Sequence, residues 1–142
     1  MKAYRIIAHG IAACVVLQAA WISAGVFVAG KKVDDGKTIS SLDDFDNWGF
    51  GLHLIFALVI PILAIALLIT AFVVKVPGAP KWAGYVFGDV VLQWVLAFIA
   101  FGVPALGVLH AVNAFIMIGL AEMAARKVGV VGPPAAAAPA SV

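Results

Sequence analysis

The chain has 142 residues, of which 65% are hydrophobic and only 11% charged, and its mean hydropathy is +1.14. Soluble domains of this length carry about a quarter charged residues and about half apolar ones. The composition therefore excludes an ordinary soluble domain and indicates an integral membrane protein. A net charge of +2, scattered along the chain, argues against a nucleic-acid-binding protein. A single cysteine, Cys14, excludes an intramolecular disulfide.

Four apolar segments follow one another along the chain, at residues 4–29, 48–74, 82–101 and 105–126. Each has about the 20 residues that a helix needs to cross the hydrocarbon core of a membrane. We therefore predict an all-α fold, a four-transmembrane-helix up-down bundle over residues 1–127. Residues 128–142 are rich in alanine and proline and are expected to form a disordered tail. No convincing internal repeat is visible at this level.

The basic residues predict the orientation of the bundle. Six of the nine start the chain, lie in the second loop or follow the fourth segment: Lys2, Arg5, Lys75, Lys81, Arg126 and Lys127. By the positive-inside rule these positions are cytoplasmic, which places both termini in the cytoplasm. The other three are lysines of the first loop and argue against the orientation that these six predict. The first loop carries more aspartates than lysines and is expected to face outward.

Local signals agree with these boundaries. Asp46 and Asn47 can cap the second segment, and the sequence VPGAPK interrupts the chain after it. Pro61 lies inside the second segment, where it removes one backbone hydrogen bond and is expected to kink the helix. Gly102 and Pro104 form the turn before the fourth segment.

Two histidines lie at matching depth in the second and fourth segments. His53 and His110 each follow the outer end of their segment by about five residues, roughly 8 Å at 1.5 Å per residue. In an up-down bundle the second and fourth helices lie on a diagonal and face each other across the core. Each histidine also has a glycine about one turn before it, Gly49 and Gly107 respectively, which would leave room for a flat group.

Facing histidines suit axial ligation of a haem iron, because the metal needs one neutral imidazole on each side of an apolar pocket. His53 and His110 are the expected ligands, and Gly49 and Gly107 would shape the pocket. Asn113, one turn after His110, would orient that imidazole or bond the edge of the cofactor. The alternative is structural: each histidine would hydrogen-bond across a helix interface and tie two helices together.

The remaining intramembrane polar residues are His9, Gln18, Asp89 and Gln93. His9 and Asp89 are both nearer the inner side and could pair with each other. Gln18 and Gln93 both fall near mid-membrane, where a mutual amide contact is the structural interpretation. The functional interpretation is a polar path toward the outer histidines that carries protons or binds a quinone head group. Glu122 is placed to pair with Arg126 at i, i+4.

Several short motifs resemble a known family. They are AHGIAACVVLQ with ISAG in the first segment, GLHL in the second, VVLQWVLAF in the third and LHAVNAF in the fourth. Together they resemble a family of small four-helix bacterial membrane proteins, found mainly in actinobacteria and classed as a domain of unknown function. The resemblance covers residues 9–126 and implies a multi-pass protein of the bacterial plasma membrane, but no activity.

A looser resemblance is to four-helix b-type cytochromes and to the membrane anchors of quinone-linked oxidoreductases. Two-haem members use two histidine pairs, whereas this chain has three histidines, so one bis-histidine haem is the most that the resemblance implies. We expect a one-haem membrane protein that transfers electrons, as a subunit of a redox complex or with a quinone, and not a free-standing enzyme. The alternative is a non-catalytic scaffold, assembly factor or small-ligand binder without haem.

Overall fold

Four long helices make up most of the part of the chain that the structure describes, residues 1–128 of a computed structural model. These helices are α1 (Lys2–Asp34), α3 (Trp48–Val74), α4 (Ala79–Gly102) and α5 (Gly107–Lys127). Two short elements lie in the connections, the helix α2 (Leu42–Phe45) and the 3₁₀ turn η1 (Pro104–Leu106). Each long helix, the last counted together with η1, is long and apolar enough to cross a membrane. The all-α, four-helix prediction is confirmed.

The helix boundaries follow local chemistry. The side chain of Asn47 accepts hydrogen bonds from the backbone N–H groups of Gly49 and Phe50, so Asn47 is the N-cap of α3, as predicted. Helix α4 begins three residues earlier than expected, because a proline fits in the first helical turn and Gly78 adopts φ +83° before it. Helix α3 continues through Pro61 to Val74. The predicted tail lies, apart from Val128, outside the described residues.

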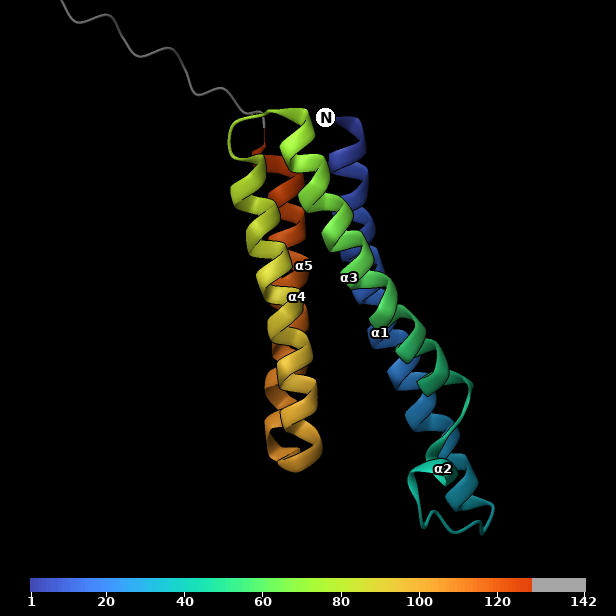
Figure 1. The fold of residues 1–142 in the computed structure, drawn as a ribbon. Coiled ribbons are helices and arrows are strands. Elements are labelled where there is room, and N and C mark those ends of the chain that lie inside the picture. Colours follow the sequence, from blue (N-terminus) through green and yellow to red (C-terminus); the bar gives the residue numbers. More distant parts are fainter. Residues whose placement is uncertain (129–142) are drawn as a thin grey trace, which may run out of the picture.

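The four long helices form a ring of antiparallel neighbours. Helix α1 packs against α3 and α5, and α4 packs against the same two helices. Helices α3 and α5 therefore lie on a diagonal, which is the arrangement predicted for the second and fourth segments. The N-terminus and the last turn of α5 lie at the same end of the molecule (Figure 1).

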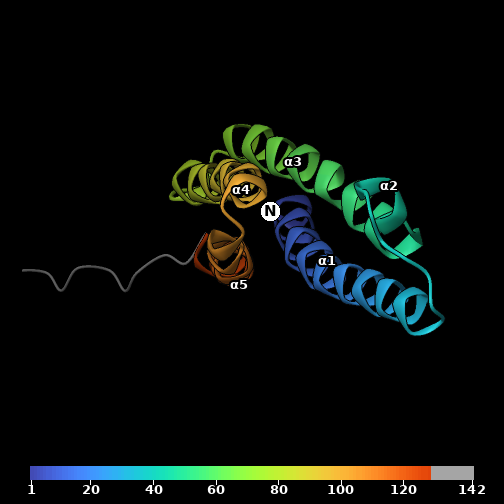
Figure 2. The ribbon, with the colours of Figure 1, turned by 90° about the horizontal axis from the view of Figure 1, so that it is seen from below.

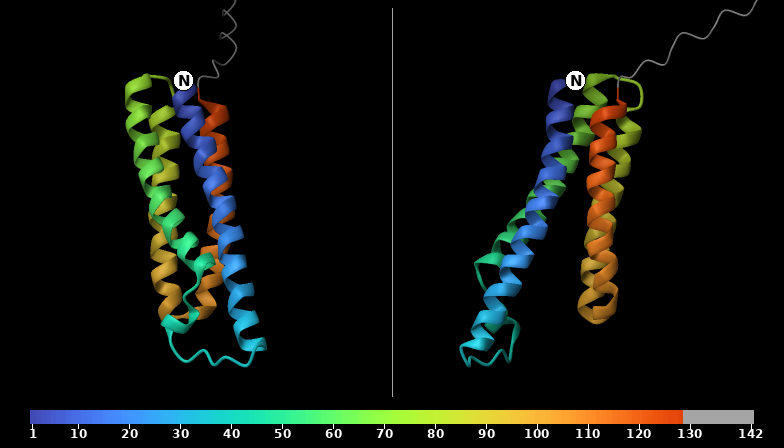
Figure 3. Two further views of the ribbon diagram at one scale, coloured as in Figure 1. Left: turned by 90° about the vertical axis from the view of Figure 1, so that its right-hand side faces the viewer. Right: turned by 180° about the vertical axis from the view of Figure 1, so that it is seen from behind.

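The two hairpins, α1–α3 and α4–α5, meet at one end of the bundle and separate toward the other. Figure 1 shows them in contact at the end that carries the N-terminus, and Figure 3 shows the same divergence from behind. Seen from the open end, the α1–α3 pair and the α4–α5 pair stand apart (Figure 2). At the closed end many buried residues are alanines, and the buried Tyr4 hydroxyl donates a hydrogen bond of 3.2 Å to the Ala79 carbonyl. Small side chains let the helices approach closely there.

The hairpins are two copies of one packing pattern. Helices α1 and α4 correspond at an offset of 75 positions, as from Gln18 to Gln93, and α3 and α5 at an offset of 57, as from His53 to His110. Eight pairs of residues at these offsets are buried in both copies: Tyr4/Ala79, Ala8/Ala83, Ile11/Val86, Val15/Val90, Ile60/Met117, Ala64/Ala121, Leu67/Ala124 and Ala71/Val128.

The sequence carries a trace of this repeat that the sequence analysis missed. VVLQ occurs at residues 15–18 and again at 90–93, and each later helix of a hairpin contains Leu-His. Parallel repeats of this kind are related by an axis that runs along the bundle, as in some transporters. The helix contacts agree, because a two-fold rotation that exchanges the hairpins also exchanges the α1–α5 contact with the α3–α4 contact.

Gly49 lies at the point where α1 and α3 cross, and its missing side chain lets the two backbones approach closely. A Cβ atom on Gly49 would lie 2.3 Å from the backbone nitrogen of Gly25 and 2.9 Å from the Trp21 carbonyl oxygen. The space beside Gly49 is therefore filled by the backbone of α1. The expectation that Gly49 leaves room for a cofactor is wrong, because the residue faces a helix and not a pocket.

The crossing predicts opposite effects for two nearby glycines. Gly49→Ala should lower the stability of the detergent-solubilised protein by about 1–3 kcal/mol, because the added methyl group forces two backbones apart. Gly51→Ala is the matched control, since a Cβ there meets nothing within 4 Å. It should be neutral or stabilising, because alanine favours a helix over glycine by roughly 0.5–1 kcal/mol. Thermal unfolding of both variants tests the crossing, and equal melting temperatures would contradict it.

A capping box organises the loop between α1 and α3. The Ser41 hydroxyl accepts from the Asp44 N–H, and the Asp44 carboxylate accepts from the Ser41 N–H. Hydrogen bonds from the backbone N–H and hydroxyl of Ser40, and from Ser41, lower the pKa of Asp44 below its ordinary value. Lys32 adds bonds of 3.0 Å to the carbonyls of Asp44 and Asp46.

This box predicts a pH-dependent loop. Because the folded pKa is lowered, the contribution of Asp44 is present above its ordinary pKa and is lost as pH falls through the lowered value. Amide hydrogen-exchange protection at Ser41 and Asp44 should fall with it on acidification, while an Asp44→Asn variant should show weak protection at every pH. Protection in the wild type that follows only the intrinsic exchange rate would contradict the box.

Candidate functional site

A cleft of about 1170 Å³ lies between the two hairpins, and all four long helices line it. Most of its wall is apolar, with side chains such as Ile22, Leu54 and Ile118. Val15, Ile60, Val90 and Met117, which correspond pairwise in the repeat, are its most deeply buried lining residues. Four polar side chains above this floor also correspond pairwise: Gln18 with Gln93, and His53 with His110.

His53 is held by a hydrogen bond inside its own hairpin. Its Nδ1 lies 3.1 Å from the carbonyl oxygen of Gln18 on α1. A carbonyl can only accept, so Nδ1 carries the proton and Nε2 is the unprotonated nitrogen of a neutral ring. Within residues 1–128 Nε2 of His53 has no hydrogen-bond partner.

His110 repeats this arrangement in the second hairpin. Its Nδ1 lies 3.1 Å from the carbonyl oxygen of Gln93 on α4. His53 and His110 both line the cleft. The structure thus brings together the two histidines that the sequence analysis paired, on diagonal helices and with the same tautomer.

The two halves differ at the glutamine side chain. The Gln93 amide nitrogen donates to the His110 carbonyl at 3.0 Å and lies 3.3 Å from Nε2 of His110. The amide of Asn113 donates to Gln93 Oε1 at 2.8 Å and to the Asp89 carbonyl at 3.4 Å. In the first half, Gln18 Oε1 is buried and has no partner among the described residues.

The remaining candidates for a cofactor pocket are placed differently from one another. Gly107 lines the cleft, in agreement with its expected place. Asn113 is buried and does not line the cleft, and it acts on His110 through Gln93. Gly49 belongs to the α1–α3 crossing described above.

Other predicted pairings change partner. His9 does not pair with Asp89; its Nδ1 lies 2.8 Å from Glu122 Oε1, because α1 packs against α5 at the closed end. Glu122 also accepts from Arg126 at 3.0 Å, as predicted. Gln18 and Gln93 form no amide contact in the described part of the chain, because they lie on opposite hairpins with the cleft between them.

The donor set of the cleft, one histidine from each hairpin in a mostly apolar lining, is of the kind that holds a haem. Its volume is somewhat above the range of roughly 300–1,000 Å³ usual for small-molecule pockets. Among residues 1–128 no cluster of three or more His, Cys, Asp or Glu side chains could hold a bare metal ion. A porphyrin supplies four of its metal's ligands, so two histidines from the protein are sufficient. The fit requires the Gln93 amide to release Nε2 of His110, whose 3.3 Å contact is the longer of its two contacts with that residue.

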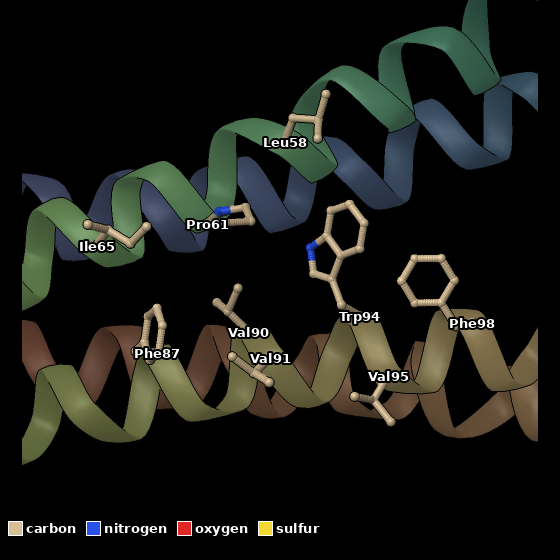
Figure 4. A pocket seen from close by; sticks show the side chains of 9 residues that line it. All are labelled: Leu58, Pro61, Ile65, Phe87, Val90, Val91, Trp94, Val95 and Phe98. Atoms are coloured by element: carbon tan, nitrogen blue, oxygen red, sulfur yellow. The ribbon is translucent and has the colours of Figure 1, made fainter.

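A second, smaller hollow of about 500 Å³ lies between α3 and α4 and was not predicted from the sequence. Figure 4 shows its wholly apolar lining, with Pro61 on one side and Trp94 and Phe98 on the other. Trp94, Phe98 and Val90 also line the large cleft. These side chains therefore separate the cleft from the outer face of the α3–α4 pair.

Comparison with known proteins adds no relative. No family model matches the chain, and no similar curated protein or solved structure was found.

The geometry predicts the tautomer of both cleft histidines before any ligand is added. In ¹⁵N NMR spectra of histidine-labelled protein at neutral pH, His53 and His110 should each show a protonated Nδ1 and an unprotonated Nε2. His9, whose Nδ1 is bonded to the Glu122 carboxylate and not to a backbone carbonyl, serves as the contrast. A protonated Nε2 on either cleft histidine would contradict the hydrogen bonds to the glutamine carbonyls.

Proposed function

We propose that this chain is a multi-pass membrane protein that binds one b-type haem in the cleft and transfers electrons. His53 and His110 would be the axial ligands. The observation that carries the proposal is the pair of equivalent imidazoles, each tied through Nδ1 to a backbone carbonyl and each lining the same apolar cleft.

The Nδ1 bonds support the proposal because they prepare each ring for a metal. A histidine ligand nearly always donates its other ring N–H to a carbonyl or carboxylate, which fixes the tautomer and raises the basicity of the ligating nitrogen. Gln18 and Gln93 provide these carbonyls from helix backbones, so the rings are held by rigid elements.

The repeat adds a second argument. A two-fold axis along the bundle passes between the hairpins, and residues that correspond across it face the same space. A haem between the hairpins would therefore be held by one histidine from each hairpin. His53 and His110 are such a pair.

When bound, haem would supply one-electron redox chemistry, and the chain's own residues bind, orient and shield it. Apolar side chains from all four helices line the cleft and would contact the cofactor. Gln93 gives up its contact with Nε2 and keeps its bond to the His110 carbonyl, and Asn113 retains the amide. The protein performs no bond chemistry on a substrate under this proposal, and it passes electrons to a redox partner or a quinone.

The proposed location is the bacterial plasma membrane, with both termini in the cytoplasm. The basic residues Lys2, Arg5, Arg126 and Lys127 all lie at the closed end of the bundle, which the positive-inside rule assigns to the cytoplasm. The cleft and its histidines then open toward the outer side.

A second candidate is a haem-free small-ligand binder. It is favoured by Gln18 Oε1, a buried acceptor without a partner beside the cleft, which would suit a ligand with a hydrogen-bond donor such as a quinol. Under this candidate Gln93 keeps its contact with Nε2 of His110.

Spectroscopy of histidine variants separates the two candidates. The detergent-purified protein should give a reduced-minus-oxidised spectrum with a b-type α-band. His53→Ala and His110→Ala should each remove or strongly diminish the band, because each deletes one axial ligand. His9→Ala is the matched control and should keep it, since His9 bonds Glu122 away from the cleft. A featureless wild-type spectrum from well-folded protein would exclude haem and favour the small-ligand binder.

A further inference from the structure

Asp89 is a buried carboxyl group that the proposed function does not use. Its side chain lies in α4 among core residues and is only 8% exposed. The carboxylate atom Oδ2 is buried and has no hydrogen-bond partner among the described residues. An unpaired carboxylate in the apolar interior is costly, so such residues usually mark a function.

The carboxyl group is present in one half of the repeat only. The offset of 75 positions places Cys14 of α1 opposite Asp89, and the offset of 57 places Phe56 of α3 opposite Asn113. Helix packing is satisfied in the first half without either polar group. Asp89 and Asn113 are therefore not required by the bundle pattern, and they distinguish the His110 side from the His53 side.

A continuous set of hydrogen bonds joins this position to the cleft. Asn113 bonds the carbonyl of Asp89 and the side chain of Gln93, and Gln93 lies against His110. Asp89 and Gln93 are one helical turn apart, roughly 6 Å along the axis. These hydrogen bonds connect the backbone carbonyl of Asp89 to the cleft, so the carboxyl group belongs to the residue at which the network ends.

Among the described residues, no positively charged side chain forms an ion pair with the Asp89 carboxylate. Helix α4 packs on α3, whose titratable group in the span is His53, and on α5, which carries His110 and Glu122. Across the core, α1 carries Cys14 and His9. Glu122 and His9 are bonded to each other, and none of these five groups makes an ion pair with Asp89.

We propose that Asp89 is the proton-binding site coupled to electron uptake at the cleft. When the site gains one electron from a one-electron donor, the Asp89 carboxylate binds one proton from water in the cleft and becomes a neutral carboxylic acid. When the electron leaves, the O–H bond breaks and the proton returns to the cleft. The net charge of the buried region is then unchanged. This inference rests on the proposed haem site.

Electrostatics gives the expected size. One unit of charge placed about 10 Å away at an effective dielectric constant near 20 changes a proton affinity by on the order of tenfold. Protonation of Asp89 raises the affinity of the cleft for an electron by the same factor, because linkage between two binding events is reciprocal.

The first test is a redox titration of the holoprotein at a series of pH values. In the wild type the midpoint potential should fall as pH rises, and this slope should add up to about 59 mV across the range in which Asp89 titrates, which is a tenfold coupling expressed as a one-electron potential. Asp89→Asn should abolish this slope while keeping the α-band. Glu122→Gln, which changes a carboxyl of α5 that bonds His9 and Arg126, is the control and should retain the slope.

The second test does not require a variant that folds. Redox-difference infrared spectra of the wild type, with ¹³C-labelled aspartate as the isotope control, should show a carboxylic-acid C=O band that appears on reduction. A wild type with haem but with a pH-independent potential and no such band would overturn the role of Asp89 and leave the haem site standing. A wild type without haem would overturn both, so the two failures are distinguishable.

Discussion

The arrangement of this bundle depends on one interaction that occurs twice, a hydrogen bond from a histidine Nδ1 to a glutamine backbone carbonyl in the neighbouring helix. In an apolar medium the N–H group of an imidazole needs a hydrogen-bond acceptor. A backbone carbonyl in the other helix of the same hairpin is the nearest rigid acceptor. The bond fixes the ring and its tautomer at 3.1 Å in both hairpins. Nε2 of His53 then has no hydrogen-bond partner among the described residues, while Nε2 of His110 lies 3.3 Å from the Gln93 amide nitrogen.

The repeat explains why that space exists. Both hairpins bury small and medium side chains at corresponding positions near the closed end, while the open end carries larger residues such as Phe50 and Phe101 along the cleft. The hairpins differ in their polar content. Asp89 and Asn113 lie in one half, and the corresponding residues of the other half are Cys14 and Phe56. A symmetric pocket with one asymmetric carboxyl is suited to coupling a charge in the pocket to a proton beside it.

Much of this could be predicted from the sequence because membrane constraints are strong. Length and hydropathy identified the four helices, with the bounds of α3 matching residue for residue, and the depth of His53 and His110 predicted that they share a level. Which polar side chains bond to each other could not be predicted, because this depends on how the two hairpins separate. A contact between Gln18 and Gln93 was one prediction, but the two side chains line opposite walls of the cleft. His9 bonds Glu122 and not Asp89. The VVLQ repeat was present in the sequence, but its meaning required the buried pairs.

The central claim is that His53 and His110 bind opposite faces of one iron. Pulsed electron paramagnetic resonance of the oxidised protein, with ¹⁵N in the histidine rings only, tests it most directly. The account predicts a low-spin ferric signal with hyperfine couplings from two imidazole nitrogens, and from one nitrogen in a His53→Ala variant that retains haem. A high-spin signal, or a single imidazole coupling in the wild type, would contradict it.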